Sequence, residues 1–143
     1  MTRRLSTNVI TMWQNSHMTI MDPHAIPDSR AHMDEGDRLD LLRLEMLVAQ
    51  GKVWDAQEAA EDLWRSSQDA HKELFHGISN ALTAACAQEA GQPRGSREIL
   101  ERTIRILEPY PRRVLGLDLD ALIRSVHEIV NRGEGPVRLV RQG

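Results

Sequence analysis

Aromatic residues and cysteine are scarce in this sequence. Phenylalanine, tryptophan and tyrosine together make up 3% of the 143 residues, and there is one cysteine, Cys86. Because aromatic and β-branched residues favour strands, the shortage of aromatic residues and of runs of β-branched residues argues against a protein built from β-sheets. A single cysteine excludes an internal disulfide bond, and the alanines around Cys86 predict a small buried side chain rather than a nucleophile.

Long hydrophobic runs and a strong net charge are also missing. No stretch approaches the roughly 20 apolar residues that a membrane-spanning helix needs. The basic start, MTRRLSTNVITMW, lacks the sustained apolar segment and the small-residue cleavage site of a secretory signal peptide. The net charge of −3 gives no reason to expect bulk attraction to nucleic acid. We therefore expect a cytoplasmic protein with no membrane association.

What remains fits one globular helical domain. Hydrophobic residues account for 41% of the chain, and a chain of this length can bury a core without disulfide bonds. From Asp37 onward, apolar residues recur with the period of an α-helix. The first helix carries one apolar stripe, formed by Leu39, Leu42, Met46 and Leu47. The sequence predicts an all-α fold, a compact array or bundle of about five helices within residues 34–133.

Glycine, proline and aspartate mark the ends of these helices. Gly51 is placed to end the first helix, and Pro93 suits the first turn of the fourth. Asp118 is placed to cap the fifth. The second and third helices are expected at about 53–66 and 70–90, and the breaks lie at 67–69, 91–95, 109–111 and 132–136.

The two ends of the chain show no lasting helical period. Residues 1–33 predict a disordered or weakly ordered, flexible N-terminal arm, and residues 134–143 predict a short basic C-terminal tail. The motifs SHM and AHM in the arm leave open whether it is native sequence or an upstream extension, with Met33 as an alternative start. Trp13 lies in the arm, away from any predicted core, and is the candidate anchor for a partner or a second copy.

One stretch, WDAQEAAEDLWR at 54–65, is unusually polar for a helix between two tryptophans. At 100° per residue, one helix face carries Trp54, Gln57, Glu61 and Trp64, and Glu58 lies one step round. We expect both tryptophans to belong to the core. A buried carboxylate such as Glu61 would then need a hydrogen-bonding partner.

The third helix supplies candidates for that partner. His76 and Asn80 project together because they are four residues apart, and small residues beside them would let another helix approach closely. We predict a polar core network formed by Gln57, Glu58, Glu61, His76 and Asn80. An alternative is a metal-dependent or acid–base enzyme that uses Glu58, Glu61 and His76. The sequence leans against catalysis, and we assign no catalytic residue, metal or cofactor.

Three blocks of the chain resemble a known family. GKVWDAQEAAEDLWR is similar to the signature of the domain-of-unknown-function 309 family, small prokaryotic all-α proteins, which reads Gly, an aromatic, then Ala-His-Glu-x-x-Glu-x-x-Trp. LFHGISNALTAACAQEAGQPRG and ILEPYPRRVLGLDLDALI resemble its second and third blocks, in the same order and spacing. The resemblance covers roughly residues 39–131. It implies an all-α fold and brings no established activity.

The match is not uniform from residue to residue. The positions that agree with the family pattern are Glu58, Glu61, Trp64, Gly77 and Asp118. The signature histidine is replaced by Gln57, two glutamines by His76 and Asn80, and a later histidine by Ala87. The His-Glu-x-x-Glu constellation that the resemblance implies has therefore lost its best metal donor.

Partner binding is the function that the sequence favours. We expect a non-catalytic protein-interaction or scaffold module, with a protein partner or a second copy bound through Trp13, Arg112 and Arg113. A second alternative is nucleic-acid binding through the arginines at 94–113. Several of these arginines follow a glutamate by four residues, which is typical of an ordinary solvated helix face.

Overall fold

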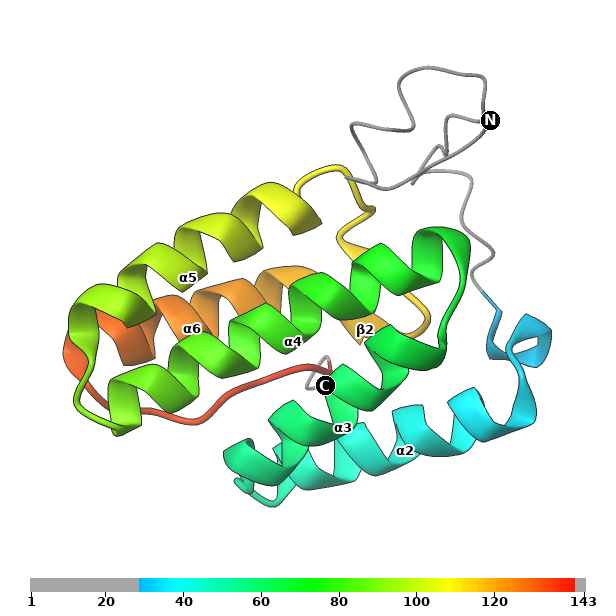
Figure 1. Cartoon of the computed structure of the whole chain (residues 1–143), viewed down its shortest axis with the longest axis horizontal. Coiled ribbons are helices and arrows are strands. Elements are labelled where there is room, and N and C mark those ends of the chain that lie inside the picture. The colour runs from blue at the N-terminus through cyan, green and yellow to red at the C-terminus, as the bar shows by residue number, and fades with distance from the viewer. Residues whose placement is uncertain (1–28, 141–143) are drawn as a thin grey trace.

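A computed structural model of the chain describes residues 29–140 and confirms the all-α prediction (Figure 1). Five α-helices are joined by short connections: α2 (Glu35–Ala49), α3 (Val53–Ser66), α4 (Asp69–Glu89), α5 (Pro93–Leu107) and α6 (Leu119–Arg132). A 3₁₀ helix, η2 (Arg30–His32), precedes them, and β1 (Arg113–Val114) pairs with β2 (Leu117–Asp118) in a short antiparallel hairpin. The greater part of the predicted arm, residues 1–28, lies outside the described residues, and Trp13 lies there too.

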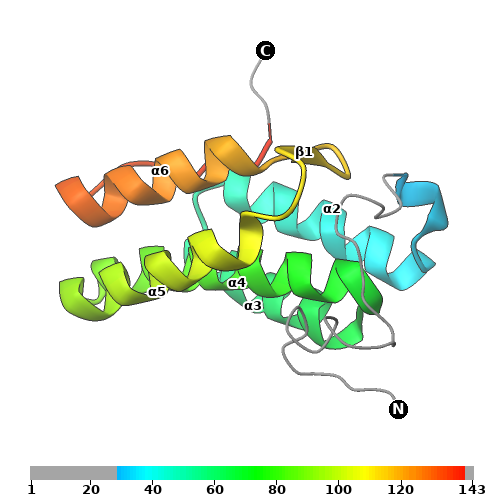
Figure 2. The same ribbon diagram turned by 90° about the horizontal axis from the view of Figure 1, so that it is seen from above.

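Helix α4 is the centre of the fold. It packs against α3, α5 and α6, whereas α2 packs mainly against α3. Figure 2 shows two layers, with α2 and α6 in one and α3, α4 and α5 in the other. Twelve residues of α4 are buried, more than on any other described helix. The core therefore surrounds α4.

Most helix ends lie where the sequence predicts them, and capping or helix-breaking residues mark several of them. The Asp118 carboxylate accepts a hydrogen bond of 2.9 Å from the Ala121 amide and caps α6. Pro93 opens α5, and Gly133 ends α6 in the left-handed conformation with φ +89°. The break before α4 lies where the sequence predicts it, although its N-cap residue, Gln68, makes no capping hydrogen bond with its side chain.

The predicted apolar stripe of α2 faces solvent instead of the core. Leu39, Leu42 and Met46 are 59%, 51% and 59% exposed, while the core takes Leu41, Leu44 and Val48 from the same helix. Leu47 is partly buried against the core. Because α2 carries apolar residues on both of its sides, the helical period alone does not say which side is buried.

The packed unit extends beyond 34–133 at both ends. On the N-terminal side, Met33 is buried, and the Arg30 guanidinium forms an ion pair of 2.7 Å with Glu45 on α2. On the C-terminal side, Leu139 is buried, and its carbonyl accepts a hydrogen bond of 2.9 Å from the Asp118 amide. Residues 134–140 therefore pack along α6 and do not form a free tail. Residues 141–143 lie outside the described part of the chain.

The contact between α4 and α5 is unusually close, as the small residues of α4 predict. A Cβ atom added to Gly77 would lie 2.5 Å from Cδ2 of Leu107 on α5. Further along the same contact, the buried Ser96 hydroxyl donates a hydrogen bond of 2.7 Å to the Ala84 carbonyl. Glycine is therefore favoured at position 77 by the nearness of the Leu107 side chain, and not by its own backbone conformation, which is ordinary helix.

The substitution Gly77→Ala tests this contact. We expect it to lower the free energy of unfolding by about 1–3 kcal/mol, because the new methyl group forces α5 away from α4. Gly95→Ala on α5 is the matched control: a Cβ there meets no atom within 4 Å. It should leave stability unchanged or raise it by up to about 1 kcal/mol through helix propensity. Urea titrations would measure the free energy of unfolding of both variants. If Gly77→Ala were as stable as Gly95→Ala, α5 would not be tightly packed at Gly77.

Candidate functional site

The predicted polar core network between α3 and α4 does not form. The Gln57 side-chain amide donates a hydrogen bond of 3.1 Å to the Thr83 hydroxyl, not to Asn80 or His76. Glu58 is exposed to solvent. Glu61 lies at the surface, 3.9 Å from Arg65 one turn along the same helix. Gln57 has a hydrogen-bonding partner, and Glu58 and Glu61 reach solvent, so none of the three needs a partner in the core.

His76 has an aromatic neighbour instead. Its ring stacks on the Trp64 indole, with the ring centroids 4.2 Å apart and the planes 11° from parallel. The Nδ1 atom of His76 lies 3.7 Å from a Glu73 carboxylate oxygen on the same helix. Trp64 is partly buried and packs against the core. The pair therefore joins α3 to α4, and the geometry is that of a packing contact.

No metal centre is formed by the part of the chain that the structure describes. Among residues 29–140, no three histidine, cysteine, aspartate or glutamate side chains are arranged to hold a metal ion. Cys86 is buried on α4, as predicted. Burial, and after it the nearby Glu89 carboxylate, raise the pKa of its thiol to about 11. At neutral pH this cysteine is a neutral thiol and a poor nucleophile.

The prediction that Trp54 belongs to the core is wrong. Its side chain is 52% exposed at the start of α3. The indole Nε1 donates a hydrogen bond of 3.0 Å to the Glu89 carboxylate near the end of α4. A helical wheel places Trp54 and Trp64 on one face, but Trp54 lies at the end of the helix, where that face runs past the core. Trp54 is therefore a fixed aromatic ring at the surface.

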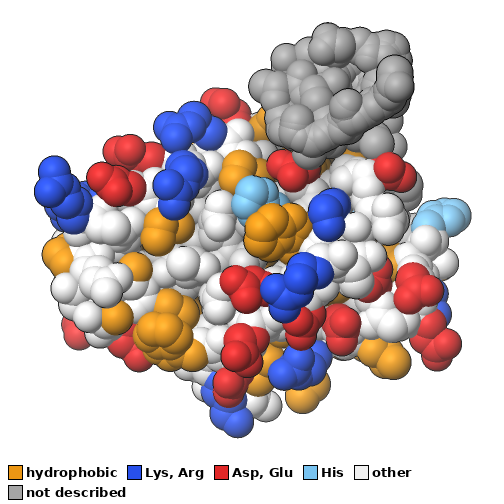
Figure 3. Space-filling view, viewed as in Figure 1, with side chains coloured by type: hydrophobic (Ala, Val, Ile, Leu, Met, Phe, Trp, Pro, Cys, Tyr) orange, Lys and Arg blue, Asp and Glu red, His pale blue; other side chains and the backbone are white. Residues whose placement is uncertain are grey.

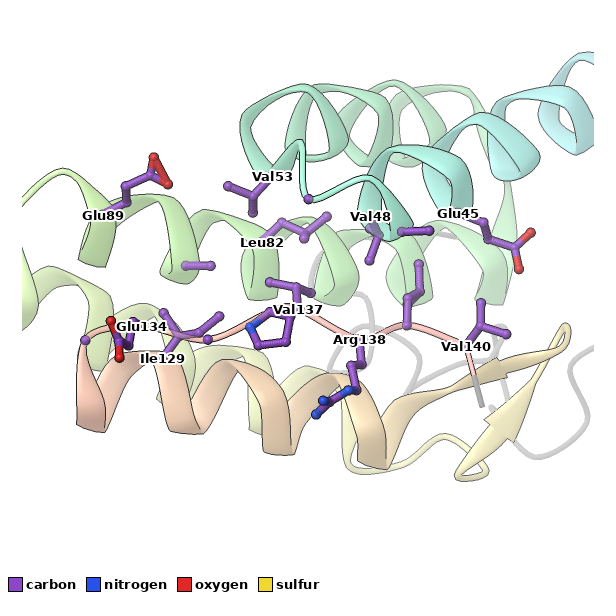
Figure 4. A pocket seen from close by; sticks show the side chains of 17 residues that line it. Glu45, Val48, Val53, Leu82, Glu89, Ile129, Glu134, Val137, Arg138 and Val140 are labelled. Carbon is purple, nitrogen blue, oxygen red and sulfur yellow. The ribbon is translucent and has the colours of Figure 1, made fainter. Parts of the chain in front are cut away.

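A hollow of about 590 Å³ lies elsewhere, between α2 and α6. We call it the groove (Figure 4). The C-terminal segment from Gly133 to Val140 lines it along its length, and α4 contributes Leu82 and Ala85. The remaining apolar lining comes from Val48, Ala49, Val53 and Ile129. The groove is thus mostly apolar and is assembled from distant parts of the chain.

Charged residues occupy the two ends of the groove. Figure 4 shows Glu89 and Glu134 at one end, and Glu45, Arg138 and Val140 toward the other. Glu45 is already paired with Arg30, so its charge is compensated. The other two carboxylates of the groove, those of Glu89 and Glu134, form no ion pair with any residue that the structure describes.

A second, smaller hollow of about 440 Å³ adjoins the groove and contains the predicted partner-binding arginines. The Arg112 guanidinium donates hydrogen bonds of 2.7 and 2.8 Å to the carbonyls of Leu107 and Tyr110, and it lies 3.4 Å from Asp120. It thereby closes the end of α5, which is a structural role. Arg113 is exposed and lines the same hollow.

The arginines of α5 face solvent, as the sequence predicts. Arg94, Arg97, Arg102 and Arg105 are all exposed. The expected pairs with Glu98 and Glu101 are absent from the ion pairs within residues 29–140. On the face that Figure 3 shows, basic and acidic side chains are interspersed and do not gather into one basic patch.

Sequence reasoning missed the groove because its parts are far apart in the chain. The lining residues on α2, α4 and the C-terminal segment share no spacing or motif. One local signal was available: Val137 and Leu139 lie on either side of Arg138, two positions apart, as on one face of an extended segment. That alternation predicts packing of residues 137–139, though not against which helix.

Comparison with known proteins gives no assignment: no family model matches the chain, and no curated protein matches it. The resemblance to the domain-of-unknown-function 309 family therefore stays a prediction. Within residues 29–140, no helix is long and apolar enough to cross a membrane.

The two tryptophans of α3 should differ sharply in their effect on stability. Trp64→Ala should cost about 3 kcal/mol, because it removes a ring packed on the core and on His76. Trp54→Ala should cost less than about 1 kcal/mol, since most surface substitutions have small effects. Denaturant titrations followed by far-ultraviolet circular dichroism would measure both values. Equal losses would mean that Trp54 is also packed.

The reactivity of Cys86 provides a pH test. At pH 8 the thiol should react slowly with Ellman's reagent, because it is buried and almost entirely protonated. Below the pKa, the thiolate fraction rises tenfold per pH unit, so the rate should rise about 100-fold from pH 8 to pH 10. Rapid, pH-independent labelling of the folded protein would contradict this description of the site.

Proposed function

We propose that this protein is a non-catalytic protein-interaction module that binds an apolar segment of a protein partner in the groove. The proposal keeps the function class that the sequence favours. It places the binding site in the groove, whereas the sequence predicts partner binding through Trp13, Arg112 and Arg113.

The observation that carries the proposal is the apolar surface that continues from the groove onto the outer side of α2. Ala49 lines the groove and is exposed. It lies three residues after Met46, which follows Leu42 and Leu39 at helical spacing, so the four share one helix face. Exposed apolar surface of this kind marks sites of protein contact.

The extent of this surface favours a macromolecule over a small ligand. A volume of about 590 Å³ suits a drug-sized molecule as well as a few side chains of a peptide. A small molecule, however, would leave the outer side of α2 in water. A partner segment that fills the groove and crosses Ala49 would also cover Leu42 and Met46, each more than half exposed.

Selection of peptides on the full chain tests the proposal. A random peptide display library would be selected on the immobilised protein, and the enriched peptides would be synthesised with a fluorescent label. We expect them to share apolar positions and to bind one per chain. Ala49→Trp places a large ring at the mouth of the groove and should weaken binding by about tenfold or more, which is about 1.4 kcal/mol.

Ala31→Trp is the matched control, because Ala31 is exposed on η2 and does not line the groove. It should leave the affinity unchanged. If the selected peptides bind the Ala49→Trp variant as tightly as the unmodified chain, the groove is not the binding site and the proposal is wrong.

A further inference from the structure

One end of the groove is acidic. Glu89 and Glu134 line it, and Glu89 holds the exposed Trp54 indole at 3.0 Å. A lysine or arginine side chain placed there would meet the carboxylates of Glu89 and Glu134, which attract cations. Within residues 29–140, no basic side chain forms an ion pair with Glu89 or Glu134.

The opposite end of the groove leads to uncompensated positive charge. Arg138 lines both the groove and the adjoining hollow, where Arg113 and Arg124 join it. The guanidinium groups of these three arginines make no hydrogen bond or ion pair with any group that the structure describes. Asp120 is occupied by Arg112, and Asp118 caps α6. An anion would find free donors here.

From this separation of charge we propose that the groove binds a dipolar partner segment. Such a segment has cationic side chains at one end, apolar side chains in the middle and anionic groups at the other end. Its cations lie beside Glu89 and Glu134, and its anions lie beside Arg124 and Arg138. The inference rests on the proposed function and names the chemistry of the partner.

The length of the groove sets the length of that segment. Residues 133–140 line the groove throughout, and an extended chain of that length spans at most about 25 Å. The partner segment is therefore about seven or eight residues if extended, or about 16 residues if helical. The apolar middle supplies most of the binding, while the charged ends fix its orientation and exclude segments with the wrong charges.

Two synthetic peptides of identical composition test the inference on the full chain. Both carry the same apolar middle, made of leucine, valine and alanine. The dipolar peptide has two lysines at one end and two glutamates at the other, and the mixed peptide has one lysine and one glutamate at each end. Fluorescence anisotropy should give about tenfold tighter binding for the dipolar peptide at low salt, with the difference shrinking as salt screens the charges.

Substitutions at the two ends of the groove then test which side chains cause the preference for the dipolar peptide. The pairs Glu89→Gln with Glu134→Gln, and Arg124→Gln with Arg138→Gln, should each remove most of the difference between the peptides. All four side chains are exposed, so these changes leave the core intact. Glu98→Gln with Arg102→Gln is the matched control on the solvent face of α5, and it should keep the difference.

The outcomes separate this inference from the proposed function. Equal binding of both peptides, blocked by Ala49→Trp, would overturn the dipolar inference and leave the groove as a site for apolar segments. Binding of either peptide that Ala49→Trp does not weaken would place the contact outside the groove and contradict both proposals. Preference for the dipolar peptide that survives both pairs of glutamine substitutions would also overturn the inference.

Discussion

The close contact of α5 with Gly77 fixes the position of most other parts of the fold. A methyl group at this position would collide with the side chain of Leu107, so α5 packs closely on α4 here. Immediately after Leu107, the Tyr110 hydroxyl donates a hydrogen bond of 2.7 Å to the Ala70 carbonyl at the start of α4. Arg112 closes the end of α5 and orients the hairpin that leads into α6. The position of α6, one wall of the groove, therefore depends on a glycine on α4.

The groove is a consequence of how the helices divide the surface of α4. Helix α2 packs mainly against α3, and α6 packs against α4 and α5, so a space is left between α2 and α6. The segment after Gly133 fills only part of this gap. Its Arg138 amide donates a hydrogen bond of 2.9 Å to the Ser125 hydroxyl, which holds it along α6. The remaining space has apolar walls because core residues such as Leu82, Val48 and Ile129 line it.

The sequence predicts where helices begin and end better than it predicts which side they bury. Caps and breakers such as Pro93 and Asp118 act locally, and the structure follows them. The inward side of α2 depends on which neighbours it meets, and its two apolar sides give no local preference. The burial of Trp54 and Trp64 is hard to predict for a related reason. The angular position of a residue on a helix does not say whether that part of the helix contacts the core. Trp54 lies beyond the core, whereas Trp64 reaches it.

A similar limit applies to charge. The carboxylates at 58–62 are adjacent in sequence and suggest chemistry, but each lies at the surface with water or a neighbouring arginine. Glu89 and Glu134 are 45 positions apart and become neighbours only because α4 and α6 end on the same side of the bundle. A chain with a net charge of only −3 can therefore hold an acidic end and a basic end across one groove. Net charge describes attraction at long range, while recognition at contact depends on where the fold leaves charges without partners.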